Sequence, residues 1–97
     1  MKSYFLSSLA YQDLDEIVSH YAPLNPNVAS KLLESVYQAM DTLANNPMMG
    51  HLKQDITSMP VRFWTFQWHY LIVYTCDDPI EIVRILSGYR DLARLLI

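Results

Sequence analysis

Three apolar runs, VRFWTF (residues 61–66), YLIVYTC (70–76) and IEIVRILS (80–87), follow one another along this chain with three residues between each and the next. Branched and aromatic side chains dominate them, which is typical of β-strands. The QWH connection (67–69) is short enough for a hairpin, and the DDP sequence (77–79) predicts a turn. Since apolar residues fall on both faces of these strands, we expect one face to pack on helices and the other to be partly exposed or covered by a partner.

Two helical patterns precede this predicted sheet. From residue 10 to 21 apolar residues recur at the spacing of one helix face, after a potential N-cap at Ser7. A second stripe covers residues 29–43, after Asn25 and Pro26, which suit a helix start. Pro23 and the NNP sequence (45–47) end the two helices, and the short connection between them makes them antiparallel.

The remaining segments complete a predicted β-α-α-β-β-β-(α) order. Residues 2–6 predict a short first strand, 48–60 a loop, and 89–96 a short C-terminal helix. The fold class is therefore α+β, with an N-terminal strand, an antiparallel helix hairpin packed on a mainly antiparallel sheet, and a short C-terminal helix. At this length, residues 1–97 form a single domain.

Composition excludes several classes of protein. The net charge is −3 and no block of Lys or Arg occurs, so we expect no sequence-specific nucleic-acid binding. No apolar run is long enough to span a membrane and no signal sequence starts the chain, so we expect a cytoplasmic protein without membrane contact. The single cysteine, Cys76, excludes an internal disulfide and is expected to be a buried, inert thiol.

Several short motifs give the chain a family resemblance. They are LSSLA (6–10), DLDEI (13–17), NPMMG (46–50), VR (61–62) before YLIVY (70–74), IVRIL (82–86), and RDL (90–92) after Gly88. In this order and spacing they resemble the RelE/ParE superfamily of bacterial toxins, and the ParE branch most. Two features depart from the pattern: Ser87 stands where many relatives have histidine, and the chain is acidic where many are basic.

The resemblance implies the toxin of a type II toxin–antitoxin module, of the kind associated with plasmid stabilisation. A ParE-like toxin is neutralised by a cognate antitoxin, which usually carries a DNA-binding domain, and inhibits DNA gyrase by binding it. No catalysis and no cofactor would then be needed. A remnant that only binds its antitoxin is a further possibility.

The alternative within the superfamily is a RelE-like, ribosome-dependent mRNA endoribonuclease. Such cleavage needs a cation at the phosphate and proton-transferring groups. The candidate residues are Arg62, Arg84, Tyr89 and Arg90, whereas Ser87 is a poor base without an activating neighbour. The competing interpretation is that Arg62 and Arg84 are sheet residues that pair with carboxylates or with an antitoxin.

The C-terminal segment supplies the candidates for target binding. Leu92 and Leu95 fall on one face of the predicted terminal helix, and Arg90 and Arg94 are spaced to form a small cationic edge. These four residues could contact gyrase, or the helix could simply cover the sheet.

The other polar and aromatic groups predict no site. The three histidines and Cys76 lack metal-ligand spacing, so we expect no metal. Asp13, Asp15 and Glu16 are expected to form a solvated helix face near a helix N-terminus. The aromatic residues of 63–74 are expected to form sheet core or a partner interface, not a platform for stacking on bases.

Overall fold

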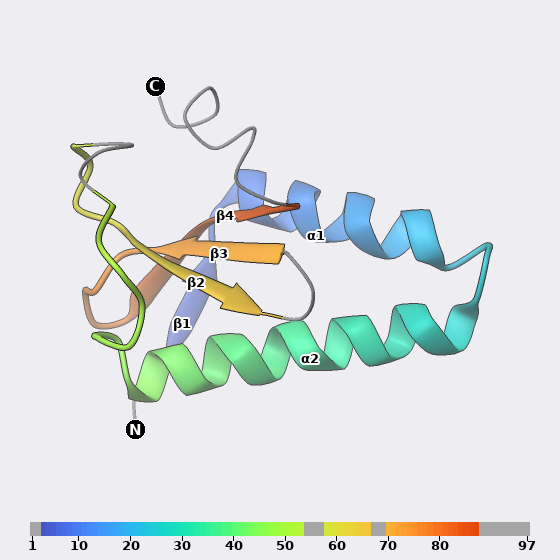
Figure 1. The fold of residues 1–97 in the computed structure, drawn as a ribbon, viewed down its shortest axis with the longest axis horizontal. Coiled ribbons are helices and arrows are strands. Elements are labelled where there is room, and N and C mark those ends of the chain that lie inside the picture. Colours follow the sequence, from blue (N-terminus) through green and yellow to red (C-terminus); the bar gives the residue numbers. More distant parts are fainter. Residues whose placement is uncertain (1–2, 54–57, 67–69, 88–97) are drawn as a thin grey trace.

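A computed structural model describes residues 3–53, 58–66 and 70–87, and confirms the α+β class. Two helices form an antiparallel hairpin, and the turn that joins them lies away from the strands (Figure 1). The elements in chain order are β1 (Tyr4–Leu6), α1 (Ser8–Tyr21), α2 (Pro26–Asn45), β2 (Arg62–Phe66), β3 (Tyr70–Tyr74) and β4 (Ile80–Leu86). The predicted C-terminal helix (89–96) lies outside the described residues.

Both helices begin where the sequence predicts. The Ser7 side chain accepts a hydrogen bond from the Ala10 backbone N–H at 3.0 Å, so it caps α1. At α2, Asn25 Oδ1 accepts from the N–H groups of Asn27 and Val28 at 3.1 and 3.3 Å, and Pro26 occupies the first helical position. These side chains satisfy donors that have no partner within the helix.

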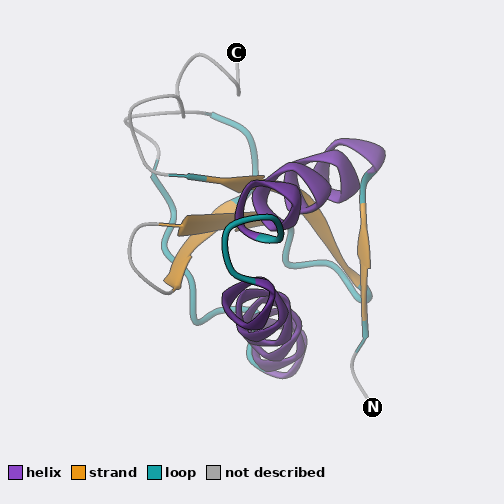
Figure 2. Cartoon of the chain, turned by 90° about the vertical axis from the view of Figure 1, so that its right-hand side faces the viewer, coloured by secondary structure: helices purple, strands orange, loops and turns teal. Residues whose placement is uncertain are grey.

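The sheet has four strands in the order β1-β4-β3-β2. β2 and β3 form the predicted hairpin, and β3 pairs antiparallel with β4. β1 pairs parallel with β4, and the helix hairpin carries the chain from β1 across to β2 at the opposite edge of the sheet. The mainly antiparallel sheet is therefore confirmed, with β1 and β2 at its edges (Figure 2).

The main core lies between the hairpin and the sheet. Leu32, Val36 and Met40 of α2 are at most 1% exposed and pack with Ile72 and Ile82 from the strands. Burying such side chains contributes about 1.5–3 kcal/mol each. This burial joins the hairpin to the sheet as one unit.

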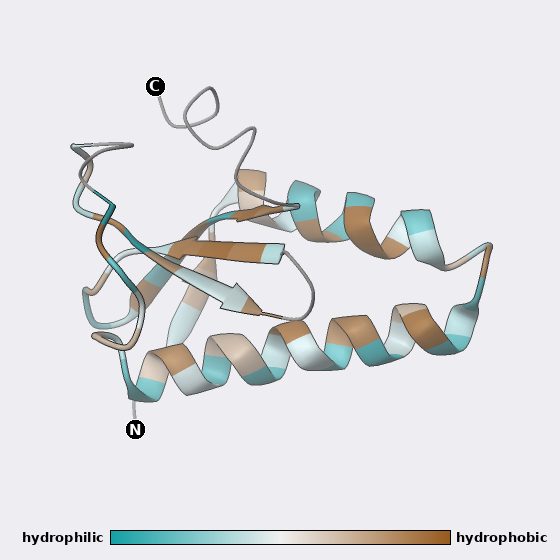
Figure 3. Cartoon of the chain, in the orientation of Figure 1, coloured by the Kyte–Doolittle hydropathy of each residue, from teal (hydrophilic) through white to brown (hydrophobic). Residues whose placement is uncertain are grey.

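The face of the sheet opposite the helices differs from the prediction. Val61, Phe63, Leu71, Val73 and Leu86 form a second cluster there, and none is more than 5% exposed. Every residue of β3 is consequently buried, and the strand is hydrophobic along almost its whole length (Figure 3). The expectation of a partly exposed or partner-covered face is wrong for these five residues, because the chain buries them itself.

The end of β3 also differs from the prediction. β3 ends at Tyr74, so Cys76 lies outside the sheet, where it is exposed. Its Sγ donates to the Pro47 carbonyl at 3.3 Å. The prediction of a buried thiol is wrong because β3 ends at Tyr74, two residues before Cys76, and leaves this side chain outside the sheet.

No helix within the described regions is long and apolar enough to cross a membrane.

Candidate functional site

The N-terminal part of α1 completes one edge of the sheet beside β4. β1 pairs with β4 only as far as Leu6 and Ile82, while β4 continues to Leu86. The Ser7 N–H donates to the Ile82 carbonyl at 3.0 Å, and Ser7 Oγ donates to the Val83 carbonyl at 2.8 Å. Backbone groups at this edge would otherwise need water or another strand. The helix start thus replaces the missing part of β1.

Asp13, six residues after Ser7 on α1, continues this edge and binds Arg84. The Arg84 Nε and Nη2 atoms each donate to one Asp13 carboxylate oxygen at 2.8 Å, and the Ile85 N–H donates to Asp13 Oδ2 at 3.0 Å. The side chains are only 15% and 12% exposed. This paired geometry is the stronger form of an Arg–carboxylate interaction. The hydrogen bonds to Asp13 raise the pKa of the Arg84 guanidinium, so it stays charged.

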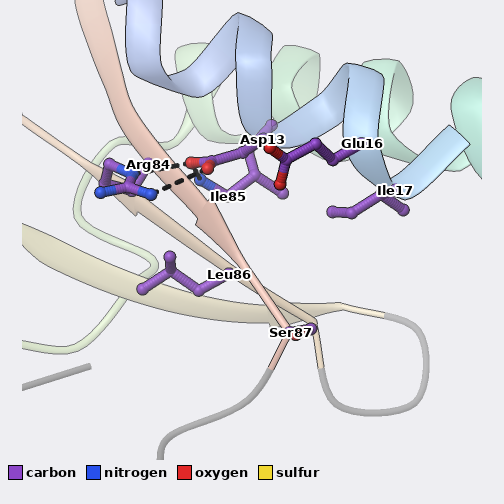
Figure 4. Close-up of a pocket in the computed structure, with 7 residues that line it drawn as sticks. All are labelled: Asp13, Glu16, Ile17, Arg84, Ile85, Leu86 and Ser87. Carbon is purple, nitrogen blue, oxygen red and sulfur yellow. Dashed lines mark hydrogen bonds and ion pairs between the residues drawn. The ribbon is translucent and has the colours of Figure 1, made fainter. Parts of the chain in front are cut away.

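A cavity of about 270 Å³ opens beside this ion pair. Its lining comes from α1 and the end of β4 (Figure 4) and comprises Asp13, Glu16, Ile17, Arg84, Ile85, Leu86 and Ser87. Two carboxylates against one guanidinium leave the lining formally negative. A phosphate would therefore have to displace Asp13 from Arg84 and approach Glu16, which is electrostatically unfavourable.

Arg62 lies on β2, separated from β4 by β3, and has a different partner. It is opposite Tyr74 in the strand register, whereas Arg84 is opposite Val73. Arg62 Nη1 donates to the Gly50 carbonyl at 2.7 Å. The arginine thereby attaches the loop that follows α2 to the sheet.

Tyr74 holds the same loop from beneath. Its hydroxyl donates to the Pro47 carbonyl and accepts from the Gly50 N–H, both at 2.8 Å. Burial is the main cause that raises the pKa of the Tyr74 hydroxyl, which keeps it neutral and able to donate. The NPMMG motif (46–50) is thus a structural junction between α2 and the sheet.

The structure describes Arg62 and Arg84 of the predicted ribonuclease residues. Arg62 and Arg84 are engaged separately, Arg84 by a carboxylate and Arg62 by a backbone carbonyl. Ser87 is exposed at the cavity. Tyr89 and Arg90 lie outside the described residues, as do Leu92, Arg94 and Leu95 of the predicted target-binding set. In the described regions, no three His, Cys, Asp or Glu side chains lie together as a potential metal site.

Sequence reasoning missed the role of Asp13. The predicted solvated face holds for Asp15 and Glu16, which are exposed, but is wrong for Asp13. Asp13 lies three residues after Ala10 and four before Ile17, so it borders the buried stripe. The position of Asp13 beside the buried stripe, together with Arg84 in a predicted strand, was the signal in the sequence that could have indicated this ion pair.

Comparison with known proteins assigns this chain to a family. A profile described as "ParE toxin of type II toxin-antitoxin system, parDE" matches residues 4–92. The chain belongs to the ParE toxin family. It is therefore the toxin of a type II toxin–antitoxin system, as the motifs indicated.

A solved structure agrees with the ParE assignment. One chain in the structure of the chromosomal ParDE toxin–antitoxin system from P. aeruginosa is 26% identical in sequence to this chain. The match covers 92% of this chain and 98% of the P. aeruginosa chain, with a TM-score of 0.73. A comparison with curated proteins gives no match. The agreement extends over most of both chains, so this ParE chain has the same fold as that structure.

Proposed function

We propose that this ParE toxin is neutralised by a cognate antitoxin and acts by binding DNA gyrase, without cleaving RNA. The observation that carries the choice against RNA cleavage is the engagement of Arg84. Its Nε and Nη2 groups, which form one edge of the guanidinium, both donate to the Asp13 carboxylate at 2.8 Å. A pre-organised phosphate site would instead present its cation to the substrate.

The electrostatics of the cavity support the same choice. A ribosomal nuclease must enter a strongly anionic environment, which favours a basic surface. Here Asp13 and Glu16 line the cavity beside Arg84, and the net charge of the chain is −3. Binding to a protein target places no such demand on the site.

Contact with gyrase is assigned to the C-terminal segment. Arg90 and Arg94 provide positive charge in a mostly acidic chain, and Leu92 and Leu95 provide apolar contact. Because the described part of the chain directs Arg62 and Arg84 inward to intramolecular partners, the terminal arginines are the better candidates for an external contact.

The antitoxin contact is assigned to the helix hairpin. Disordered segments that fold on a partner commonly do so as an added strand or as a helix in a groove, and we expect the same of the antitoxin. The far face of the sheet is at most 5% exposed in its apolar cluster, so that part of the surface offers little apolar area. The hairpin, by contrast, exposes Leu9, Tyr11 and Tyr37. An antitoxin with its own DNA-binding domain would use a separate segment for this contact.

Induction of the toxin alone tests this proposal in cells. We expect DNA synthesis to stop before protein synthesis, because gyrase inhibition blocks replication first. Pulse labelling with a DNA precursor and with an amino acid measures the two rates, and co-induction of the adjacent reading frame should restore both. Early loss of protein synthesis with cut messenger RNA would identify the ribonuclease alternative. Unchanged growth would indicate an inactive remnant.

A further inference from the structure

The cavity between α1 and the end of β4 contains a carboxylate with no partner in the part of the chain that the structure describes. We call this feature the α1–β4 cavity (Figure 4). Asp13 and Arg84 in its lining bind each other at 2.8 Å. Glu16 is exposed in the same lining, and no hydrogen bond or ion pair between described residues engages it. One further cation would therefore make the lining neutral.

Apolar side chains form much of the remaining lining. Ile17 is half-buried on α1, and Ile85 and Leu86 of β4 are at most 5% exposed. Glu16 and Ile17 project from α1 toward the end of β4 (Figure 4), so acidic and apolar surfaces lie side by side. An arginine fits this combination, because its guanidinium pairs with a carboxylate while its stem lies on apolar surface.

The described cations do not supply that group. Apart from Arg84, no basic residue of the described regions lines the α1–β4 cavity. Lys31 belongs to α2, which contributes nothing to the lining, and Arg62 donates to the Gly50 carbonyl. The cation must therefore come from elsewhere.

The chain itself continues from the α1–β4 cavity. Ser87 is the last described residue and lines the cavity, and the sequence GYRDLARLLI (88–97) follows it. Arg90 is three residues further on, which is within about 10 Å of extended chain. The segment contains two arginines and one carboxylate among mostly apolar residues. A cation tethered so close has a high effective concentration at the cavity.

Other occupants fit the α1–β4 cavity less well. An anion would be repelled by Glu16 and would have to displace Asp13 from Arg84. A second copy of the chain carries a net charge of −3, so its approach is opposed by like charge. A cation on any separate molecule lacks the advantage of the tether.

We propose that the α1–β4 cavity holds the start of the C-terminal segment, with the Arg90 guanidinium paired with the Glu16 carboxylate. Glu16 is then a positioning residue, because anchoring the segment at Arg90 fixes where Arg94 and Leu95 lie and lowers the cost of ordering them on a target. Arg90 acts on the target through the position of the segment, and Arg94 acts by contact. The docking needs no assumption about the target, whereas its effect on inhibition rests on the proposed gyrase contact.

Hydrogen exchange tests the docking on the full-length toxin alone. We expect Glu16→Gln to speed exchange of the backbone amides of residues 88–94 about twofold to fivefold at low ionic strength, which is the range for an exposed ion pair. Asp15→Asn is the matched control. It removes the same charge from an exposed neighbour that does not line the α1–β4 cavity, and should leave exchange unchanged. Circular dichroism confirms that both variants are folded.

Charge exchange identifies the partner of Glu16. Glu16→Arg should speed exchange more than Glu16→Gln does, and Arg90→Glu in the same protein should restore slow exchange, whereas Arg94→Glu should not. Equal exchange in the wild type, Glu16→Gln and Asp15→Asn would overturn the proposal, as would rescue by Arg94→Glu alone. Protection that grows with toxin concentration would also overturn it, because the segment would then come from a second copy.

Gyrase supercoiling separates the docking from the proposed function. Glu16→Gln should raise the toxin concentration for half-inhibition about twofold to fivefold, and Asp15→Asn should leave it unchanged. If the wild-type toxin leaves gyrase fully active, the proposed function fails, while hydrogen exchange still decides the docking. If Glu16→Gln speeds exchange but leaves inhibition unchanged, the positioning role of Glu16 is wrong.

Discussion

Replacement of Arg84 by alanine is expected to lower the free energy of unfolding by about 2–4 kcal/mol. The change leaves the Asp13 carboxylate, only 12% exposed, without its cation. Asp13 would still accept from the Ile85 N–H, but two charge-assisted hydrogen bonds at 2.8 Å would be lost. Urea denaturation followed by circular dichroism measures the loss.

A double-mutant cycle provides the control for this effect. Asp13→Ala also removes the partner of Ile85, whereas Asp13→Asn keeps an acceptor of similar shape and removes only the charge. We expect Asp13→Ala and Arg84→Ala to show a coupling energy of about 1.5–3 kcal/mol. A loss below about 0.5 kcal/mol for Arg84→Ala would mean that the ion pair is not structural. A well-folded variant that had lost RNA cleavage would favour the ribonuclease alternative.

Gly50→Ala is expected to destabilise the protein by a similar amount, about 2–4 kcal/mol, through overpacking. A Cβ at this position would collide with the Tyr74 hydroxyl, and would lie 2.8 Å from Tyr74 Cε1 and 3.0 Å from the Phe63 carbonyl oxygen. Tyr74 is fully buried and held by two hydrogen bonds, so it cannot move without breaking them. The midpoint of urea denaturation reports the change.

Tyr74→Phe tests the cause of the Gly50→Ala effect. Alone it should cost about 1–3 kcal/mol, because the Gly50 N–H and the Pro47 carbonyl lose their partner. In this background Gly50→Ala should cost less than in the wild type, since the nearest colliding atom is gone. Strict additivity of the two changes would contradict the steric explanation.

The fold was largely predictable because its elements carry local signals. Ser7 and Asn25 cap the two helices as expected, and the apolar stripes that follow face the core. Turn residues separate β3 from β4 in the predicted place. Such signals depend on neighbours in sequence, which a single chain displays directly.

The candidate site was less predictable because its contacts connect distant residues. Asp13 and Arg84 are 71 positions apart, and although Asp13 borders the buried stripe of α1, that local position does not reveal which residue it pairs with. The burial of Val73 and Leu71 on the far face likewise depends on tertiary packing. Motif resemblance indicated the family, but the pairing of Arg84 required coordinates.

The most direct test of the account is DNA supercoiling by purified gyrase in the presence of the purified toxin. We expect supercoiling to be inhibited in proportion to toxin concentration, the adjacent-frame product to relieve the inhibition, and Arg90→Gln/Arg94→Gln to inhibit less at unchanged thermal stability. The same preparation should leave messenger RNA intact on ribosomes. Full gyrase activity at saturating folded toxin, together with cleavage of ribosome-bound messenger RNA, would contradict the account.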